Sequence, residues 1–221
     1  MPIKAYVFDA YGTIFDVHSA IARHRAAVGA DADRFSELWR TKQLEYTWTL
    51  TLMGRYENFL TLTERALDFC LAQFPGVDRK LKAPLLDAYL TLDAYPDARP
   101  ALAALKADGV ATAILSNGSP EMLAAAVHGA RLHDVLDRVL SVEVVRAFKP
   151  LPEVYDLALD ALGVAADDVA FVSSNRWDIA GAANRGLVAI WVNRAGNPEE
   201  YPGLASVAVI RSLAEIADLS L

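Results

Sequence analysis

Short runs of apolar residues recur along the chain, and most of them stop at polar or turn-forming residues. The first run covers residues 3–8 and ends at Asp9. Further runs cover residues 110–115, 139–144, 169–172 and 188–192. Apolar runs of this length, bounded by turn-forming residues, are typical of buried β-strands. We therefore predict a strand over each of these ranges.

Segments with the apolar spacing of a helix lie between the later runs. They cover residues 99–107, 121–126, 153–162 and 178–185. Strands that alternate with helices form βαβ units, in which the strands are parallel. The pattern predicts an α/β fold with a doubly wound parallel sheet. Ligands of such sheets bind beyond the carboxyl ends of the strands.

The alternation is interrupted after the first strand. Residues 16–95 are rich in Arg, Leu, Glu, Trp and Tyr, and their dominant pattern is helical. Within them, residues 46–52 alternate with threonine, which alone would suggest a strand, but no helix breaker separates them from residues 36–42. We interpret this segment as helix. The predicted organisation is a Rossmann-like core of residues 1–15 and 96–221, with residues 16–95 inserted as a helical cap domain.

Composition and charge narrow the class of protein. Of 221 residues, 54% are hydrophobic and 22% are charged, which excludes a disordered chain. The net charge of −7 argues against a nucleic-acid or membrane-surface partner. The amino-terminal residues lack the pattern of a signal peptide, and no apolar run approaches the roughly 20 residues of a membrane span. We expect a soluble, cytoplasmic protein.

Side chains able to carry chemistry follow several predicted strands. They are Asp9, Ser116–Asn117, Lys149 and Ser173–Asn175. The carboxyl ends of parallel strands share one edge of the sheet, so these side chains are expected to meet in one site. From position alone, Asp9 could be a nucleophile, a metal ligand, or a cap of a helix or turn.

Five stretches carry a resemblance to a known family. They are FDAYGT at 8–13, LWRTKQLEYTW at 38–48, ILSNGSP at 114–120, FKPLPEVY at 148–155 and FVSSNRWD at 171–178. The core stretches resemble the haloacid dehalogenase superfamily, and the insert and the last stretch resemble its L-2-haloacid dehalogenases in particular. The resemblance implies hydrolysis of L-2-haloacids to D-2-hydroxy acids and halide, through an ester on Asp9. It also implies no cofactor, and a homodimer with apolar cap residues such as Trp48 and Leu52 at its interface.

Two features separate the sequence from the superfamily's phosphatases. Those enzymes typically carry an acid two residues after the nucleophile. The residue at that position here is Tyr11, which cannot donate a proton near neutral pH. Those enzymes also hold Mg²⁺ with an acidic residue in a loop that corresponds to residues 173–175 here. These three residues are neutral in this sequence. Halide leaves without a proton, so such a site suits carbon–halogen cleavage. A phosphatase and a non-catalytic binding module are the alternatives.

The resemblance also implies roles for individual residues. The expected catalytic residues are Asp9, Thr13, Arg40, Ser116, Lys149, Tyr155, Ser173, Asn175 and Asp178. The expected substrate-binding residues are Ala10, Tyr11, Arg40, Leu44, Phe59, Ser116, Asn117, Lys149, Asn175 and Trp177. No metal-binding residue is expected, because the four histidines do not have the spacing of a metal site.

Within this set, Arg40 is expected to stabilise the departing halide. Thr13, Ser116 and Asn117 are expected to hydrogen-bond the carboxylate of Asp9 or of the substrate. Ser173 and Asn175 would orient Asp9 and the hydrolytic water. The structural alternatives are a solvated Arg40 and ordinary turn capping by the others.

Asp178 is expected to pair with Lys149 and to help activate water, and Tyr155 to join this network. The pairing with lysine would make Asp178 a weaker base. The alternatives are a helix cap for Asp178, a surface position for Lys149, and plain core packing for Leu44 and Phe59. Thr41, Leu151 and Arg176 depart from the residues usual in the resembled family, which leaves the substrate range open.

Overall fold

A six-stranded sheet forms the centre of the computed structural model, which describes residues 3–220. The strand order is β3-β2-β1-β4-β5-β6, and all neighbouring strands are parallel. The strands are β1 (Ala5–Phe8), β2 (Ala111–Ser116), β3 (Arg138–Ser141), β4 (Val169–Ser173), β5 (Val188–Val192) and β6 (Ala208–Ile210). The predicted parallel α/β sheet is confirmed.

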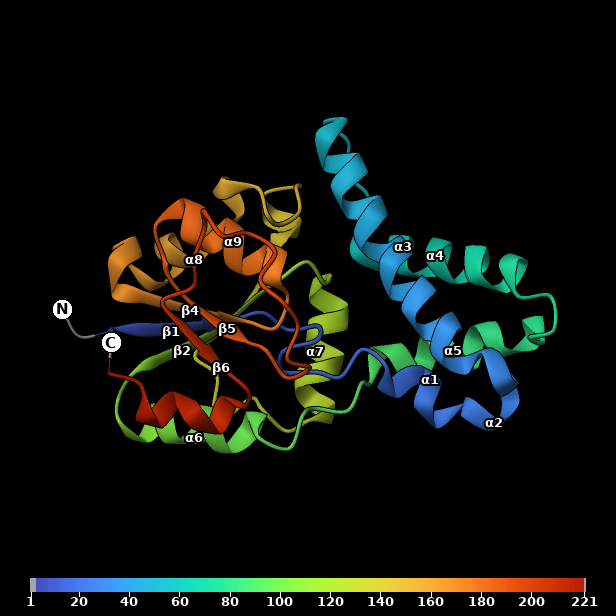
Figure 1. Cartoon of the computed structure of the whole chain (residues 1–221), viewed down its shortest axis with the longest axis horizontal. Coiled ribbons are helices and arrows are strands. Elements are labelled where there is room, and N and C mark those ends of the chain that lie inside the picture. Colours follow the sequence, from blue (N-terminus) through green and yellow to red (C-terminus); the bar gives the residue numbers. More distant parts are fainter. Residues whose placement is uncertain (1–2, 221) are drawn as a thin grey trace.

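The central strands are mostly apolar, as expected for a sheet that helices cover on both faces. All residues of β1 and β4 are buried. Helices α8 and α9 cover one face, and α6 lies on the other with the 3₁₀-helix Leu213–Asp218 (Figure 1). The helices that follow the insert are α6 (Ala98–Ala107), α7 (Pro120–Gly129), α8 (Pro152–Leu162) and α9 (Arg176–Arg185).

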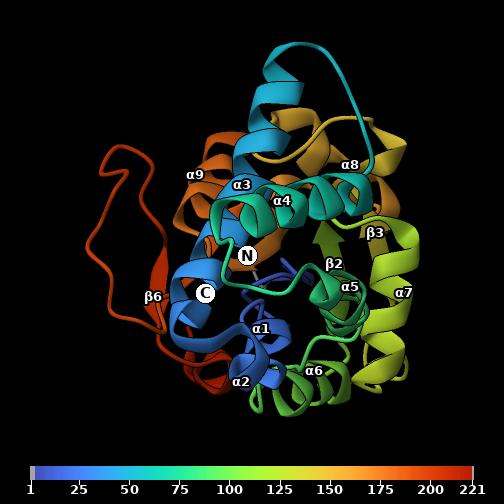
Figure 2. The ribbon, with the colours of Figure 1, turned by 90° about the vertical axis from the view of Figure 1, so that its right-hand side faces the viewer.

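A group of helices lies beyond the carboxyl ends of the strands (Figures 1 and 2). Its members are α1 (Ser19–Arg23), α2 (Arg25–Val28), α3 (Ala32–Leu52), α4 (Phe59–Gln73) and α5 (Lys82–Leu90). The threonine-interleaved segment falls inside α3, so its interpretation as helix is confirmed. The group has apolar and polar contacts of its own: buried Gln43 donates to Thr63 and accepts from Tyr89.

Two connections join this helical group to the sheet, and they run side by side. Phe15 and Ala94 form an antiparallel bridge, the amide of Asp16 donates to the carbonyl of Asp93, and the amide of Tyr95 donates to that of Ile14. The outgoing and returning chains are thus tied together close to the residues where the sequence predicts the cap to begin and end.

The structure corrects two details of the predicted strands. Only the first part of the run 139–144 is extended, because Ser141 accepts a hydrogen bond from Glu143 and begins a 3₁₀-helix at Val142–Val144. The edge strand β6 was not predicted, since it is only three residues long and only one of the three is buried. No helix of the described residues is long and apolar enough to cross a membrane.

Candidate active site

Asp9 directly follows the central strand β1 at its carboxyl end. Its amide donates to the carbonyl of Val172 in β4, 2.9 Å away, and the residue is only 5% exposed. The chain then turns sharply, with Gly12 at φ +97°, a conformation that residues with a Cβ rarely adopt. The carbonyl of Ala10 accepts from Thr13, Ile14 and Phe15. This turn brings the Thr13 hydroxyl back towards Asp9.

Three side chains hydrogen-bond the Asp9 carboxylate. Thr13 Oγ1 and Asn175 Nδ2 donate to Oδ2 over 3.1 and 2.9 Å, and Lys149 Nζ lies 3.1 Å from Oδ1. Thr13 is itself held by the amide of Ser174, which donates to its hydroxyl. Both oxygens of the carboxylate are therefore fixed in direction by groups from three different segments.

Lys149 lies between two carboxylates. Its Nζ is 3.0 Å from Oδ2 of Asp178, and both of these side chains are fully buried. Tyr155 donates its hydroxyl to Oδ1 of Asp178 over 2.7 Å. A buried ammonium needs such partners, because an uncompensated charge is costly in the interior. The expected Lys149–Asp178 pairing and the place of Tyr155 in it are thus present in the geometry.

The acidity of Asp178 differs from the expectation drawn from pairing alone. Burial raises its pKa to about 6, against the lowering effect of Lys149, and the neighbouring Asp9 raises it further. Desolvation disfavours the charged carboxylate more than the lysine favours it. Asp178 is consequently a stronger base than an exposed aspartate, contrary to the sequence-based expectation.

Arg40 reaches from α3 to the loop that follows Asp9. Its Nη2 donates to the carbonyl of Tyr11 over 3.1 Å, and Asn175 donates to the same oxygen over 3.2 Å. The Arg40 side chain therefore points towards the sheet instead of being solvated on the outer face of the helix. Arg40 is thus the expected residue that places a positive charge from the helical group near Asp9.

Tyr11 is packed in the helical group and away from solvent. Its ring stacks on Tyr89 and contacts Phe59, with centroids 5.8 Å apart in each pair. Burial raises the pKa of the Tyr11 hydroxyl well above its usual value. The residue is thus even less able to donate a proton than its type suggests.

Ser116, Asn117 and Ser173 each accept a hydrogen bond from a backbone amide in the structure. Ser116 accepts from the amide of Gly118, and Ser173 accepts from the amide of Asn175. Asn117 Oδ1 accepts from the amide of Lys149 and so positions the lysine segment. Within the described residues, none of the three hydrogen-bonds the Asp9 carboxylate, and of the expected hydroxyls only Thr13 does.

The remaining expected pocket residues are buried or half-buried. Ala10 and Phe59 are buried, and Phe59 also contacts the ring of Phe148 at 6.4 Å. Leu44 is half-buried on α3. Trp177, which follows Asn175 by two residues, is half-buried and lines a pocket of about 410 Å³. No group of histidine, cysteine and acidic residues able to hold a metal ion occurs in residues 3–220.

Residues 3–186 match the family model described as haloacid dehalogenase-like hydrolase. The chain belongs to this family. It is 49% identical to (S)-2-haloacid dehalogenase 1 of Pseudomonas sp. (strain CBS-3), covering 100% of this chain and 97% of the relative. It is 48% identical to (S)-2-haloacid dehalogenase 4A of Burkholderia cepacia, covering 97% of this chain and 93% of the relative.

Solved structures of the haloacid dehalogenase family share the whole fold. A crystal structure of a dehalogenase superposes with a TM-score of 0.96 at 46% identity, covering 99% of this chain and 97% of the other. The L-2-haloacid dehalogenase of Xanthobacter autotrophicus, with chloropropionic acid covalently bound, has a TM-score of 0.89 at 38% identity and covers 98% of each chain. The expected membership of the superfamily and the expected fold class are confirmed.

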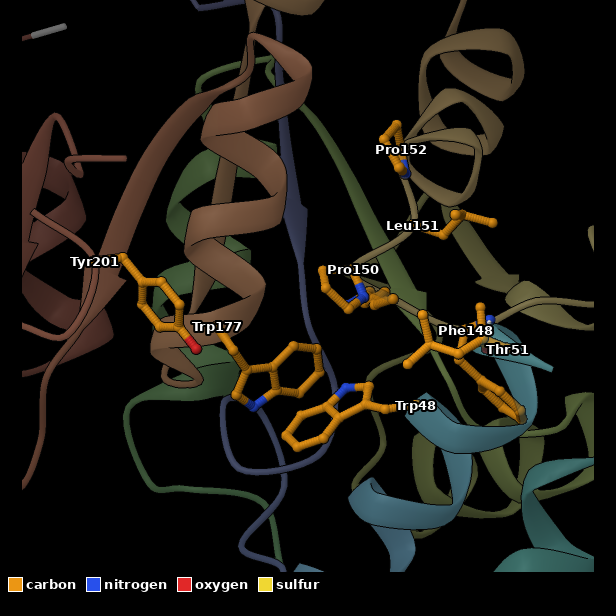
Figure 3. Close-up of a pocket in the computed structure, with 10 residues that line it drawn as sticks. Trp48, Thr51, Phe148, Pro150, Leu151, Pro152, Trp177 and Tyr201 are labelled. Carbon is orange, nitrogen blue, oxygen red and sulfur yellow. Dashed lines mark hydrogen bonds between the residues drawn. The ribbon is translucent and has the colours of Figure 1, made fainter. Parts of the chain in front are cut away.

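The three positions that depart from the family's usual residues lie in different surroundings. Thr41 is exposed on α3, Leu151 lines the 410 Å³ pocket, and Arg176 is buried at the start of α9. Sequence reasoning placed Trp48 at a dimer interface and missed its position in the lining of this pocket (Figure 3), where its ring meets that of Trp177 edge-on, with centroids 5.4 Å apart. Helical spacing could have found it, since it follows Leu44 by one turn.

Proposed function

We propose that this hydrolase converts L-2-haloacids into D-2-hydroxy acids and halide, without a metal, through an ester formed on Asp9. The observation that carries the proposal is the Asp9 carboxylate itself, held by Lys149, Asn175 and Thr13 at a strand end. The two curated relatives, both (S)-2-haloacid dehalogenases, support the substrate class.

In the first step, an oxygen of Asp9 attacks C2 of the acid from the side opposite the halogen. The new C–O bond forms as the carbon–halogen bond breaks, and the halide leaves with the electron pair. Attack from the rear inverts the configuration at C2. The hydrogen bonds to Asp9 fix its direction, which lowers the entropy lost in reaching the transition state.

Two cations assist this displacement. Lys149 compensates the charge of the Asp9 carboxylate, and Arg40 stabilises the negative charge that develops on the halogen. Arg40 is placed for this by its hydrogen bond to the carbonyl of Tyr11. Ser116 and Asn117 have amide and hydroxyl donors near the same strand ends, and we assign them to the substrate carboxylate. Ala10, Leu44, Phe59 and Trp177 would form the surrounding wall.

In the second step, water attacks the carbonyl carbon of the Asp9 ester. Asp178 accepts the proton of the water, which its raised pKa of about 6 permits near neutral pH. The bond between the Asp9 carbonyl carbon and the ester oxygen then breaks, and that oxygen takes the proton from Asp178 to become the hydroxyl of the product. Ser173 and Asn175 would orient the water and the ester, while Tyr155 holds Asp178.

A phosphatase of the same superfamily is less well supported. Protonation of a departing alkoxide requires an acid, and the buried Tyr11 hydroxyl, with its pKa well raised, is not one. A halide requires no such proton. A non-catalytic binding module would leave the buried charges of Asp9, Lys149 and Asp178 without a common purpose.

Residues 16–95 act in this proposal as a cap that brings Arg40 and the aromatic wall to the catalytic core of residues 1–15 and 96–221. We also propose a homodimer through the apolar end of α3, where Leu52 is 87% and Met53 62% exposed. Trp48, expected at that interface, lies half-buried against Trp177. A cytoplasmic location stays a prediction.

The test compares halide release from L-2-chloropropionate with phosphate release from p-nitrophenyl phosphate. We expect halide release from the L-acid, formation of D-lactate, and at least 100-fold slower reaction of the D-acid. Phosphate release without halide release would favour the phosphatase. Release of neither would leave only the binding module.

A further inference from the structure

Arg194 and Asp97 form a two-point ion pair beyond the carboxyl end of β5, and neither belongs to the residues assigned to the reaction so far. Arg194 follows β5 by two residues, and Asp97 directly precedes α6. Nη1 and Nη2 of the arginine donate to Oδ2 and Oδ1 of the aspartate over 2.7 and 3.0 Å. The two side chains are only 22% and 15% exposed. Two parallel hydrogen bonds fix the plane of a guanidinium as well as its position.

The carboxylate of this pair is itself held in place. The hydroxyl of Ser212 and the amide of Leu213 donate to Oδ2 of Asp97 over 2.7 and 2.9 Å. Burial alone would raise the pKa of Asp97, but the hydrogen bonds from Arg194 and from these two groups outweigh it and hold the pKa below its usual value. Asp97 is therefore ionised at neutral pH and compensates the charge of the arginine.

The guanidinium of Arg194 also lies over the ring of Tyr95, with Cζ 4.1 Å from the ring centre. Tyr95 belongs to the chain that returns from the helical group, and its amide donates to the carbonyl of Ile14. Nε of Arg194 is buried and has no hydrogen-bond partner within residues 3–220. An unpaired buried donor costs free energy. The contacts with Asp97 and the ring thus set the direction of the guanidinium against that cost.

A further contact of Arg194 reaches the loop that follows Asp9. Nη2 of the arginine donates to the carbonyl of Thr13 over 3.3 Å. The Thr13 hydroxyl donates in turn to Oδ2 of Asp9 over 3.1 Å and accepts from the amide of Ser174 over 2.8 Å. A single residue therefore connects the guanidinium to the Asp9 carboxylate, since Arg194 holds its backbone and its side chain holds Asp9.

Arg194 and Arg40 hold this loop at two carbonyls. Arg40 donates to that of Tyr11 from α3, and Arg194 donates to that of Thr13 from the end of β5. Because a side chain moves with its backbone, a shift of the Thr13 carbonyl also displaces the hydroxyl from Asp9. A displacement of about 1 Å at a reacting group can cost roughly 100-fold in rate.

We infer that Arg194 is a positioning residue for the reaction, which fixes the backbone of Thr13 so that the threonine hydroxyl holds the Asp9 carboxylate in its attacking direction. The inference rests on the proposed function and adds a residue on which its first step depends. Arg194 acts through geometry and not through charge, because Asp97 compensates its charge and Thr13 accepts through a neutral carbonyl. The two residues in contact, Arg194 and Thr13, are 181 residues apart in the sequence.

Arg194→Met, Thr13→Val and the double variant form a cycle that tests this role. Halide release from L-2-chloropropionate measures attack by Asp9. Arg194→Met should lower the maximal rate of halide release about tenfold and change KM less than about twofold, since the substrate does not contact the arginine. In the Thr13→Val background, where the hydroxyl is already absent, the same change should lower the rate less than about twofold. Arg99→Met, which removes the exposed pair of α6 with Asp134, is the control and should leave the rate unchanged.

The outcomes separate the inference from the function on which it rests. Equal losses from Arg194→Met with and without the Thr13 hydroxyl would show a general effect on the fold and would overturn the inference alone, as would an unchanged rate or a loss seen only in KM. If Arg194→Met does not fold, Asp97→Asn, which keeps the arginine but weakens its hold, takes its place in the same cycle with the same expected coupling to Thr13. No halide from the wild type would overturn the proposed function, and the inference with it.

Discussion

Lys149 and Asp178 form an ion pair in which neither side chain is exposed at all, with Nζ and Oδ2 3.0 Å apart. Solvent screens a buried pair of this kind very little, and each charge is compensated by the other. The same ammonium also binds Asp9, so the nucleophile and the proposed base share one cation. Several properties of the enzyme follow from that arrangement.

Lys149→Met should destabilise the fold most strongly at neutral pH. The variant leaves the carboxylate of Asp178 buried without its cation, a change that costs about 3–5 kcal/mol in the free energy of unfolding. The pKa of Asp178 should then rise further above 6, so lowering the pH protonates the group and narrows the difference from wild type. Chemical denaturation at pH 5 and pH 8 measures this. Lys82→Met, which removes an exposed pair with Asp68, is the control. An equal loss at both pH values would contradict the prediction.

The hydrolysis of the ester should slow at low pH. Asp178 is neutral below its pKa of about 6 and cannot then accept a proton, so the rate should fall towards tenfold per pH unit at acidic pH. Esterification of Asp9 removes the charge that raises this pKa, so the midpoint for the ester should lie at or below 6. Single-turnover kinetics that separate halide release from hydroxy-acid release measure the step. Asp178→Asn should accumulate the ester, while Asp160→Asn, exposed on α8, should not. A pH-independent hydrolysis rate would exclude Asp178 as the base.

Asp9→Ala should reduce halide release more than 100-fold and leave the circular dichroism spectrum unchanged. No second carboxylate among the described residues occupies the end of β1, and Lys149 keeps Asp178 as a partner. Residual activity above one hundredth of wild type would argue against covalent catalysis by Asp9.

A single turnover in ¹⁸O water, with enzyme in excess, should place the label in the Asp9 carboxylate. The new oxygen of the product comes from Asp9 in the ester mechanism and should be unlabelled. Mass spectrometry of the hydroxy acid and of the peptide containing Asp9 measures both. Label in the product, and none in that peptide, would show that water attacks C2 directly and that Asp9 is a general base.

Excess EDTA should leave the rate of halide release within twofold of the untreated enzyme. The prediction follows from the neutral Ser173–Asn175 loop and from a nucleophile whose counter-charge is an ammonium. Halide is measured with and without chelator, and after addition of Mg²⁺. Activity that is lost with EDTA and restored by Mg²⁺ would contradict a metal-independent mechanism.

Leu52→Lys should convert a dimer into a monomer. The side chain is 87% exposed at the end of α3, and a charge there would be costly to bury in an interface. Light scattering at micromolar concentration measures the mass, and Val139→Lys, at a partly exposed position on β3, is the matched control. A monomeric wild type would refute the proposed homodimer.

The sequence by itself determined the parallel sheet and the strand end at which the chemistry lies. Apolar runs indicate buried strands, and their alternation with helices indicates that the strands are parallel. The carboxyl ends of parallel strands lie at the same edge of the sheet. Asp9, Lys149 and Asn175 could therefore be expected together, although Lys149 and Asp9 are 140 residues apart. The short edge strand β6 escaped prediction because its apolar pattern is brief and partly exposed.

Only the tertiary structure decided how these groups act on one another. The pKa of Asp178 depends on the competition between desolvation and Lys149, and desolvation, which is set by all the segments packed around this side chain, outweighs the cation. The structure likewise gave Ser116 the amide of Gly118 as its partner and Asn117 the amide of Lys149, and it left Thr13 as the hydroxyl that binds Asp9. The buried Arg176 donates to the carbonyls of Tyr201 and Leu204, and such hydrogen bonds depend on where a loop lies and not on which side chains it carries.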